Sequence, residues 1–345
     1  MRYKKNNLFL RQCQYGIIKK KGVIAVYQNK KVLLIAGGGT LGTKTAEELL
    51  RLGATVEILC PEEKVSAHER LSFHQGMGTE ETLSKLFEKT HYDGIVNFIH
   101  YKEVEDYKKI HPLLIANTDH LIFLSSYRVY GDAQHPITES APQLEKLITD
   151  PYFQENEKYA VPKSRCEDYL RNERAGENWT IVRPVISFSD RRLDLLLYSK
   201  DRVPDAIREG KTLKLPEMVK DFTAGWDWSG NSGKLIANLL FKPCTIGEAY
   251  TVTSGQGHTW GDVAALYEKL AGLKVSWCSE EEYLDFHTVL REVELMHWAW
   301  IYDRRYNRDM DCTKIMAATG LTKTDFTPAE EALRIELEKR GLCKV

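Results

Sequence analysis

The segment from Val32 to Leu59 constrains the fold more than any other part of the chain. Its sequence, VLLIAGGGTLGTKTAEELLRLGATVEIL, joins an apolar run to a glycine triplet, then to a helical pattern that ends at Gly53, and finally to a second apolar run. Glycines let the chain turn sharply and present backbone N–H groups to a pyrophosphate at a helix N-terminus, where the helix dipole favours negative charge. The segment therefore predicts one βαβ unit of a dinucleotide-binding sheet, although a flavodoxin-like or other α/β domain would show a similar glycine turn.

The glycine motif deviates at its first position. A G-x-x-G-x-x-G register fits only on Ala36, Gly39 and Gly42, so alanine replaces the first glycine. Alanine is the smallest replacement and Gly37 follows it directly, so we interpret the loop as altered but functional. After the second strand, the position where dinucleotide folds often place an acid for the adenosine ribose holds Cys60. The sequence therefore leaves open whether the cofactor is NAD or NADP.

Composition excludes several classes of protein. A chain of 345 residues predicts a large α/β unit with a smaller lobe, and its net charge of −1 gives no overall attraction to nucleic acid or to an anionic membrane. Seven cysteines without a CxxC pair predict reduced thiols in a cytoplasmic setting, and neither they nor the ten histidines have metal-ligand spacing. No apolar run approaches the roughly 20 residues that a membrane helix needs. We expect a soluble protein without a metal site.

The first 31 residues carry many basic side chains and no acidic one. We interpret them as a solvated extension before the first strand. The alternative is an arm that docks on an acidic partner or on nucleic acid.

Further buried strands are predicted at residues 71–75, 94–99 and 120–126, with helical patterns between the strands. This alternation is typical of a Rossmann-type, doubly wound parallel sheet, in which ligands bind at the carboxyl ends of the strands. We expect the dinucleotide-binding domain at 32–186, with a returning segment near 220–253. Residues 187–345 would form mainly a substrate-binding lobe.

The predicted strand at 120–126 ends in two serines, which begin the sequence SSYRVYG at 125–131. About thirty residues later the predicted helix KYAVPKSRCEDYL carries Tyr159 and Lys163. Residues four apart on a helix share one face. The ammonium group would lower the pKa of the phenol, so that tyrosine could exchange a proton with a substrate hydroxyl or carbonyl while a nearby serine holds the same oxygen. This arrangement predicts hydride transfer at an alcohol carbon, whereas the alternative is an ordinary amphipathic surface helix.

These motifs together resemble the extended short-chain dehydrogenase/reductases of the NAD-dependent epimerase/dehydratase family. The resemblance is carried by AGGGTLG at 36–42, SSYRVYG at 125–131, YAVPKSRCE at 159–167, TIVRP at 180–184 and GEAYTVTSGQGHTWGDVAALYEKLAG at 247–272. It runs from about Lys31 to the C-terminus. Within the family, these sequence motifs are most similar to those of an atypical branch that includes chloroplast stem-loop-binding proteins and bacterial sugar-nucleotide epimerase homologues.

The resemblance implies roles for individual residues. Tyr159 would be the acid/base, Lys163 would lower its pKa and bind the nicotinamide ribose, and Ser126 would complete the triad. The implied cofactor contacts are Gly37, Gly38, Gly39, Thr40, Leu41 and Gly42 at the pyrophosphate, Cys60 near the ribose, and Phe98, Ile99, Pro184 and Val185 along the walls.

One departure bears on the reaction. The 4,6-dehydratases carry an Asp-Glu pair after the triad residue, and this chain has Tyr127 and Arg128 there. The resemblance therefore argues against a dehydratase of the usual kind. It implies an NAD(P)-dependent epimerase, or a keto-reductase or dehydrogenase, that acts on a nucleotide-linked sugar.

Arginines in the second half of the chain are candidates for binding a substrate diphosphate. They are Arg191, Arg192 and Arg202, which could equally be solvated surface residues. The late segment YDRRYNRDMD at 302–311 would either contact a phosphate or form an ion-pair network.

Two rival functions remain. One is an RNA-binding protein of the stem-loop-binding branch, which the neutral net charge disfavours. The other is a reductase of a small isoprenoid or phenolic substrate, which would need an apolar cleft. A homodimer is expected only by resemblance.

Overall fold

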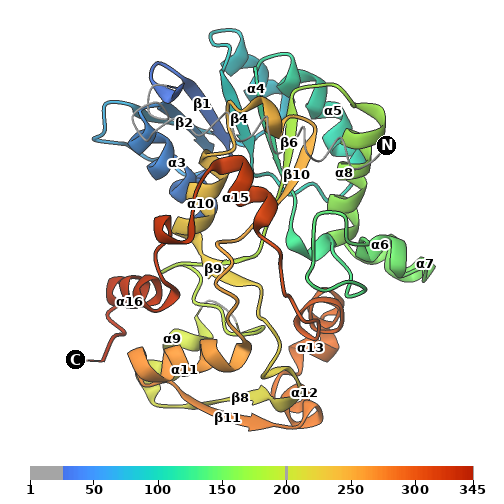
Figure 1. Ribbon diagram of the computed structural model, residues 1–345, viewed down its shortest axis with the longest axis vertical. Helices are drawn as coiled ribbons and strands as arrows, with labels where there is room; N and C mark the ends of the chain where they lie inside the picture. The colour runs from blue at the N-terminus through green and yellow to red at the C-terminus, as the bar shows by residue number, and fades with distance from the viewer. Residues whose placement is uncertain (1–25, 199–200, 345) are drawn as a thin grey trace.

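A seven-stranded parallel sheet forms the larger part of the protein (Figure 1). The computed structural model describes residues 26–198 and 201–344, so most of the basic N-terminal segment lies outside the described residues. In the order β10-β6-β5-β4-β1-β2-β3, the strands are Glu248–Val252, Trp179–Pro184, Leu121–Leu124, Gly94–Asn97, Lys31–Ile35, Thr55–Cys60 and Leu71–Gln75. This order, with helices on both faces, confirms the predicted Rossmann-type fold.

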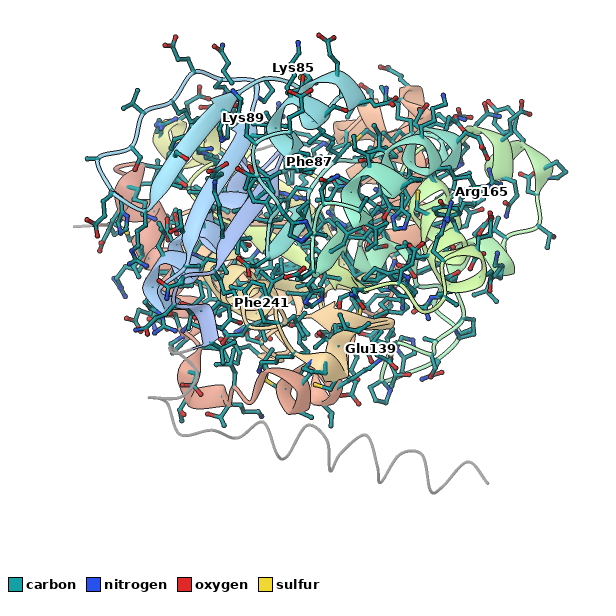
Figure 2. All side chains as sticks on the ribbon, turned by 90° about the horizontal axis from the view of Figure 1, so that it is seen from above. Lys85, Phe87, Lys89, Glu139, Arg165 and Phe241 are labelled. Atoms are coloured by element: carbon teal, nitrogen blue, oxygen red, sulfur yellow. The ribbon has the colours of Figure 1, made fainter. Side chains whose placement is uncertain are left out.

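Helices cover both faces of the sheet, each with its own core. One face carries α3 (Thr40–Leu52), α10 (Ser229–Ala237) and α15 (Thr313–Thr319), and the other carries α4 (Glu80–Phe87), α5 (Val104–Ile115) and α8 (Ala160–Glu173). Successive side chains of a strand point to opposite faces. Val32 of β1 accordingly joins the first core and Leu33 the second. Figure 2 labels one residue from each core, Phe241 and Phe87.

Most of the remaining elements form a smaller lobe beyond the carboxyl ends of the strands (Figure 1). Two strand pairs, β7 with β9 and β8 with β11, pack with helices around a shared core that includes Leu215, Tyr267 and Leu333. The strands are β7 (Ile186–Phe188), β8 (Thr212–Pro216), β9 (Trp226–Trp228) and β11 (Lys274–Cys278), and the helices are α9 (Arg202–Glu209), α11 (Trp260–Ala271), α12 (Glu280–Phe286), α13 (Val289–Glu292), α14 (Glu294–Ala299) and α16 (Ala329–Lys339). Two short helices, α6 (Leu144–Leu147) and α7 (Pro151–Asn156), precede α8.

The sheet has its switch point between β1 and β4. The chain leaves β1 toward α3 on one face and leaves β4 toward α5 on the other. Ligands of open α/β sheets bind in the crevice at this point, beyond the carboxyl ends of the strands. Within the described part of the chain, no helix is long and apolar enough to cross a membrane.

Candidate active site

A cavity of about 550 Å³ lies along the carboxyl edge of the sheet, between the sheet and the smaller lobe. The segments that follow β1, β4, β5 and β6 line one side of it, and residues of the smaller lobe line the other. Of the residues predicted from the sequence, the cavity is lined by Gly39, Thr40, Leu41, Gly42, Phe98, Ser126, Tyr159, Pro184, Val185 and Arg192. The fold thus gathers segments that are far apart in the sequence around one space.

The glycine loop has the shape of a phosphate cradle. A Cβ at Gly42 would lie 2.3 Å from the carbonyl oxygen of Gly37, so only glycine lets α3 approach the loop this closely. Gly39, the N-cap of α3, has no heavy atom within 4 Å of the place where a Cβ would lie. The first N–H groups of a helix lack partners within the helix, and the helix dipole favours an anion there. The loop therefore fits the pyrophosphate of a dinucleotide.

Ala36 takes the backbone conformation that a glycine would adopt most easily. Its φ is 55°, in the left-handed region, and its side chain is exposed at the edge of the cavity. The sequence showed the replacement but not this conformation. The turn is therefore preserved at the expense of local backbone strain.

Two cations hold the outer side of the loop. Lys64 Nζ donates a hydrogen bond to the carbonyl oxygen of Gly38 at 3.2 Å, and Arg191 Nη1 donates to the same oxygen at 3.0 Å. Cys60 is buried beside Gly38, and its Sγ donates to the carbonyl oxygen of Glu62 at 3.4 Å. Arg191 thus binds the loop itself in this structure.

Some predicted residues lie outside the cavity. The following predicted residues are within the described part of the chain but do not line the cavity: Gly37, Gly38, Cys60, Ile99, Lys163, Arg191 and Arg202. The Ile99 side chain packs beside Gly78, and the Arg202 guanidinium lies 5.5 Å from the centre of the Phe286 ring.

Tyr159 lies at the N-cap of α8, one residue before the helix that was predicted to contain it. The cause is Glu157, whose buried Oε2 accepts hydrogen bonds from the backbone N–H groups of Tyr159, Ala160 and Val161 at 3.0, 2.6 and 2.9 Å. A carboxylate in this place satisfies N–H groups that the helix leaves free. The cap holds the phenol at the cavity while Lys163 is in the first turn of the helix.

Lys163 is buried behind the phenol. Its Nζ donates hydrogen bonds to the carbonyl oxygens of Leu124 at 2.8 Å and Ser125 at 3.3 Å, and it lies 5.7 Å from the centre of the Tyr159 ring. These carbonyl groups at the end of β5 fix the ammonium group. Its charge therefore acts on Tyr159 without a direct hydrogen bond being required.

The electrostatics favour ionisation of Tyr159. Burial raises the pKa of the phenol. The positive charges of Lys163 and Arg128 and a hydrogen bond with Ser126 lower this pKa by more than burial raises it, so the pKa lies below its ordinary value. Burial also lowers the pKa of Lys163, although the charge of an ionised Tyr159 opposes this effect. A tyrosine with a depressed pKa can serve as a base closer to neutral pH.

Several residues beside Tyr159 were not predicted as part of the site. The Arg128 guanidinium lies 4.6 Å from the centre of the Tyr159 ring, and the His100 ring lies 5.1 Å from it. Asp194 of the smaller lobe also lines the cavity, as does Arg304, which belongs to the segment 302–311 that was predicted to contact a phosphate or form an ion-pair network. Arg128 was visible as a departure from the dehydratase pattern, directly after the serine pair, whereas no local pattern marks His100 or Asp194.

Comparison with solved structures agrees with this fold. The chain resembles the solved structures of an epimerase of Methanothermobacter thermautotrophicus (16% identity, covering 93% of this chain and 95% of that one, TM-score 0.68) and of the UDP-glucose 4-epimerase of Thermotoga maritima with UDP-glucose (15%, 90% and 98%, TM-score 0.64). The enzyme WbmH of Bordetella bronchiseptica, in complex with NAD+, is also similar (17% identity, 91% and 99%, TM-score 0.62). At these identities the likeness shows the fold. No curated protein matches the chain.

A match to a protein-family model shows the family, which the solved structures alone do not. The model described as the NAD dependent epimerase/dehydratase family matches residues 33–229, which is more than half of the chain. The match spans the glycine loop, the serine pair after β5 and the Tyr159–Lys163 pair. The chain therefore belongs to the NAD-dependent epimerase/dehydratase family.

Proposed function

We propose that this protein transfers hydride reversibly at a hydroxyl-bearing carbon of a nucleotide-linked sugar, using NAD or NADP. The observation that carries the proposal is the position of the Tyr159 phenol, which lines the same cavity as the glycine loop and has Lys163 Nζ 5.7 Å from its ring centre. A bound nicotinamide would supply hydride transfer. The residues of this chain that would hold the dinucleotide are those of the loop from Gly37 to Gly42, with Phe98, Pro184 and Val185 along the cavity wall.

Tyr159 would take the proton of the substrate hydroxyl as that carbon is oxidised, and return it when the carbonyl is reduced. Ser126, which hydrogen bonds with the phenol, would hold the same substrate oxygen. Lys163 would keep Tyr159 ionised through its charge, held in place by the carbonyl oxygens of Leu124 and Ser125. Return of hydride to the other face of the ketone would give epimerisation. Release of the ketone, with exchange of the reduced cofactor for oxidised cofactor, would make the protein a dehydrogenase, and the reverse direction would make it a keto-reductase.

A nucleotide-linked substrate is supported by the arginines of the cavity. Arg192 and Arg304 line it on the side of the smaller lobe. Arginine binds phosphate oxygens through paired N–H groups. The similar structure of the UDP-glucose 4-epimerase contains UDP-glucose.

Tyr159→Phe tests the proposal. Purified wild-type and variant proteins would be titrated calorimetrically with NAD(H) and NADP(H), and turnover would be followed on a panel of nucleotide sugars. We expect unchanged cofactor affinity and a loss of turnover of about 10²- to 10⁴-fold, because the acid/base group alone is removed. The control is Tyr152→Phe, at a tyrosine that is 57% exposed on α7. Full activity of Tyr159→Phe would refute the assigned role.

A further inference from the structure

The end of the cavity at Tyr159 holds more positive than negative charge. Arg128, Arg192, Arg304 and Asp194 line it, and four further charged side chains contact these residues, their partners or Tyr159. Among the described residues, this set contains five cations (Arg128, Lys163, Arg192, Arg304, Arg308) and three carboxylates (Glu157, Asp194, Asp303). An excess of positive charge remains even when Tyr159 is ionised.

Two buried carboxylates lie near Arg128, and both also serve other groups. Asp303 accepts hydrogen bonds from Tyr127 Oη at 2.9 Å and Arg308 Nε at 3.2 Å, and it also pairs with Arg304. Glu157 uses its Oε2 to cap α8, whereas its buried Oε1 has no hydrogen-bond partner and forms a long ion pair with Arg128. Neither carboxylate forms a hydrogen bond of normal length with Arg128.

Arg128 retains donors for a ligand. Its Nη2 lies 3.5 Å from Glu157 Oε1 and its Nε lies 3.6 Å from Asp303 Oδ2, and both distances exceed those of normal hydrogen bonds. A guanidinium carries five N–H donors in a rigid plane that matches a carboxylate. The side chain is only 14% exposed, so an anion that it binds would be largely removed from water.

The position of Arg128 relative to Tyr159 selects the kind of anion. The guanidinium carbon lies 4.6 Å from the centre of the Tyr159 ring, so an anion on Arg128 lies within the width of one sugar ring of the phenol. In a hexose that reacts at C4, the exocyclic carbon is attached to the neighbouring ring carbon. The diphosphate is attached at C1, across the ring, and Arg192 and Arg304 remain available for it.

We propose that Arg128 binds a carboxylate at the exocyclic carbon of the sugar, so that the substrate is a nucleotide-linked uronic acid. This inference rests on the proposed function, since it places the reacting hydroxyl at Tyr159. Arg128 sets substrate preference in this account and holds the sugar with its reacting carbon beside the phenol.

The test measures binding and does not depend on turnover. NAD-loaded protein would be titrated calorimetrically with UDP-glucuronate and UDP-glucose, and with GDP-mannuronate and GDP-mannose as a second matched pair. We expect wild-type protein to bind the acid of at least one pair about tenfold or more tightly than the neutral sugar. Arg128→Gln should abolish this preference and leave the affinity for the neutral sugar and for NAD within about threefold.

Two further variants sharpen the result. Arg128→Lys keeps the charge but loses the paired geometry, so it should retain part of the preference. Arg305→Gln is the control, since Arg305 is 37% exposed and pairs with Glu280 at 3.3 Å. If Arg128→Gln fails to fold, the preference of the wild type and of Arg128→Lys decides the question.

The possible failures are distinguishable. Equal or weaker binding of both acids by wild-type protein, with NAD and the neutral sugars bound, refutes the uronic acid alone. A preference that survives in Arg128→Gln assigns the carboxylate to another residue and refutes the role of Arg128. Absence of NAD binding, or of binding by all four nucleotide sugars at millimolar concentration, refutes the proposed function and this inference together.

Discussion

Replacing Ala36 with glycine should stabilise the protein, because Ala36 holds a φ of 55° in the left-handed region. That conformation costs a residue other than glycine about 1–2 kcal/mol. The additional freedom of glycine in the unfolded chain offsets about 0.5–1 kcal/mol of the gain. The alanine methyl group is exposed, so little apolar burial is lost with it. The net effect is a gain of about 0.5–1 kcal/mol in the free energy of unfolding.

The assay is thermal unfolding of the cofactor-free protein, followed by circular dichroism. For a chain of this size, the gain corresponds to a rise in Tm of roughly 1 °C. Ala67→Gly is the matched control, because Ala67 is also exposed and is not among the residues with positive φ, so its replacement should lower Tm slightly. A fall in Tm for Ala36→Gly equal to that of the control would show that the loop is not strained.

Two further predictions concern the cofactor loop and the base. Gly42→Ala should destabilise the protein by about 2 kcal/mol or more, since its Cβ would lie 2.3 Å from the Gly37 carbonyl oxygen. Gly39→Ala should change the free energy of unfolding by less than about 1 kcal/mol and should mainly weaken cofactor binding. Equal melting temperatures for the two variants would contradict this prediction. The pKa of Tyr159 is lowered by Lys163 against the effect of burial, so the rate of sugar oxidation should rise with pH and level off once the phenol is ionised. Lys163→Ala removes that positive charge and should move this rise to higher pH in a pH–rate profile, whereas an unshifted profile would show that Lys163 does not act through Tyr159.

The sheet was the part of the fold that the sequence predicted best. The predicted strand at 71–75 coincides with β3, but β3 is an edge strand with exposed residues and not the buried strand that was expected. The predicted strands at 94–99 and 120–126 were longer than β4 (Gly94–Asn97) and β5 (Leu121–Leu124). Local apolar patterns do not show where a ladder of hydrogen bonds stops, because that depends on the neighbouring strand.

Only some of the predicted residues line the cavity, and its other lining residues come from distant parts of the chain. Tyr159 and Lys163 were recognised by their spacing, but the position of Tyr159 at the N-cap follows from Glu157, which no helical pattern marked. Asp303 lies far from Arg128 in the sequence, and only the fold brings the two side chains within 3.6 Å. The charge balance at the reacting end of the cavity therefore could not be inferred from either segment alone.

The central claim is that this chain binds a nicotinamide dinucleotide on the loop from Gly37 to Gly42. The direct measurement is to denature the purified protein, analyse the released small molecules, and titrate the cofactor-free protein with NAD(H) and NADP(H). We expect release of one of these cofactors, or binding with a Kd of roughly micromolar, and weaker binding in Gly39→Ala. Absence of released cofactor together with no binding of either dinucleotide at millimolar concentration would contradict it.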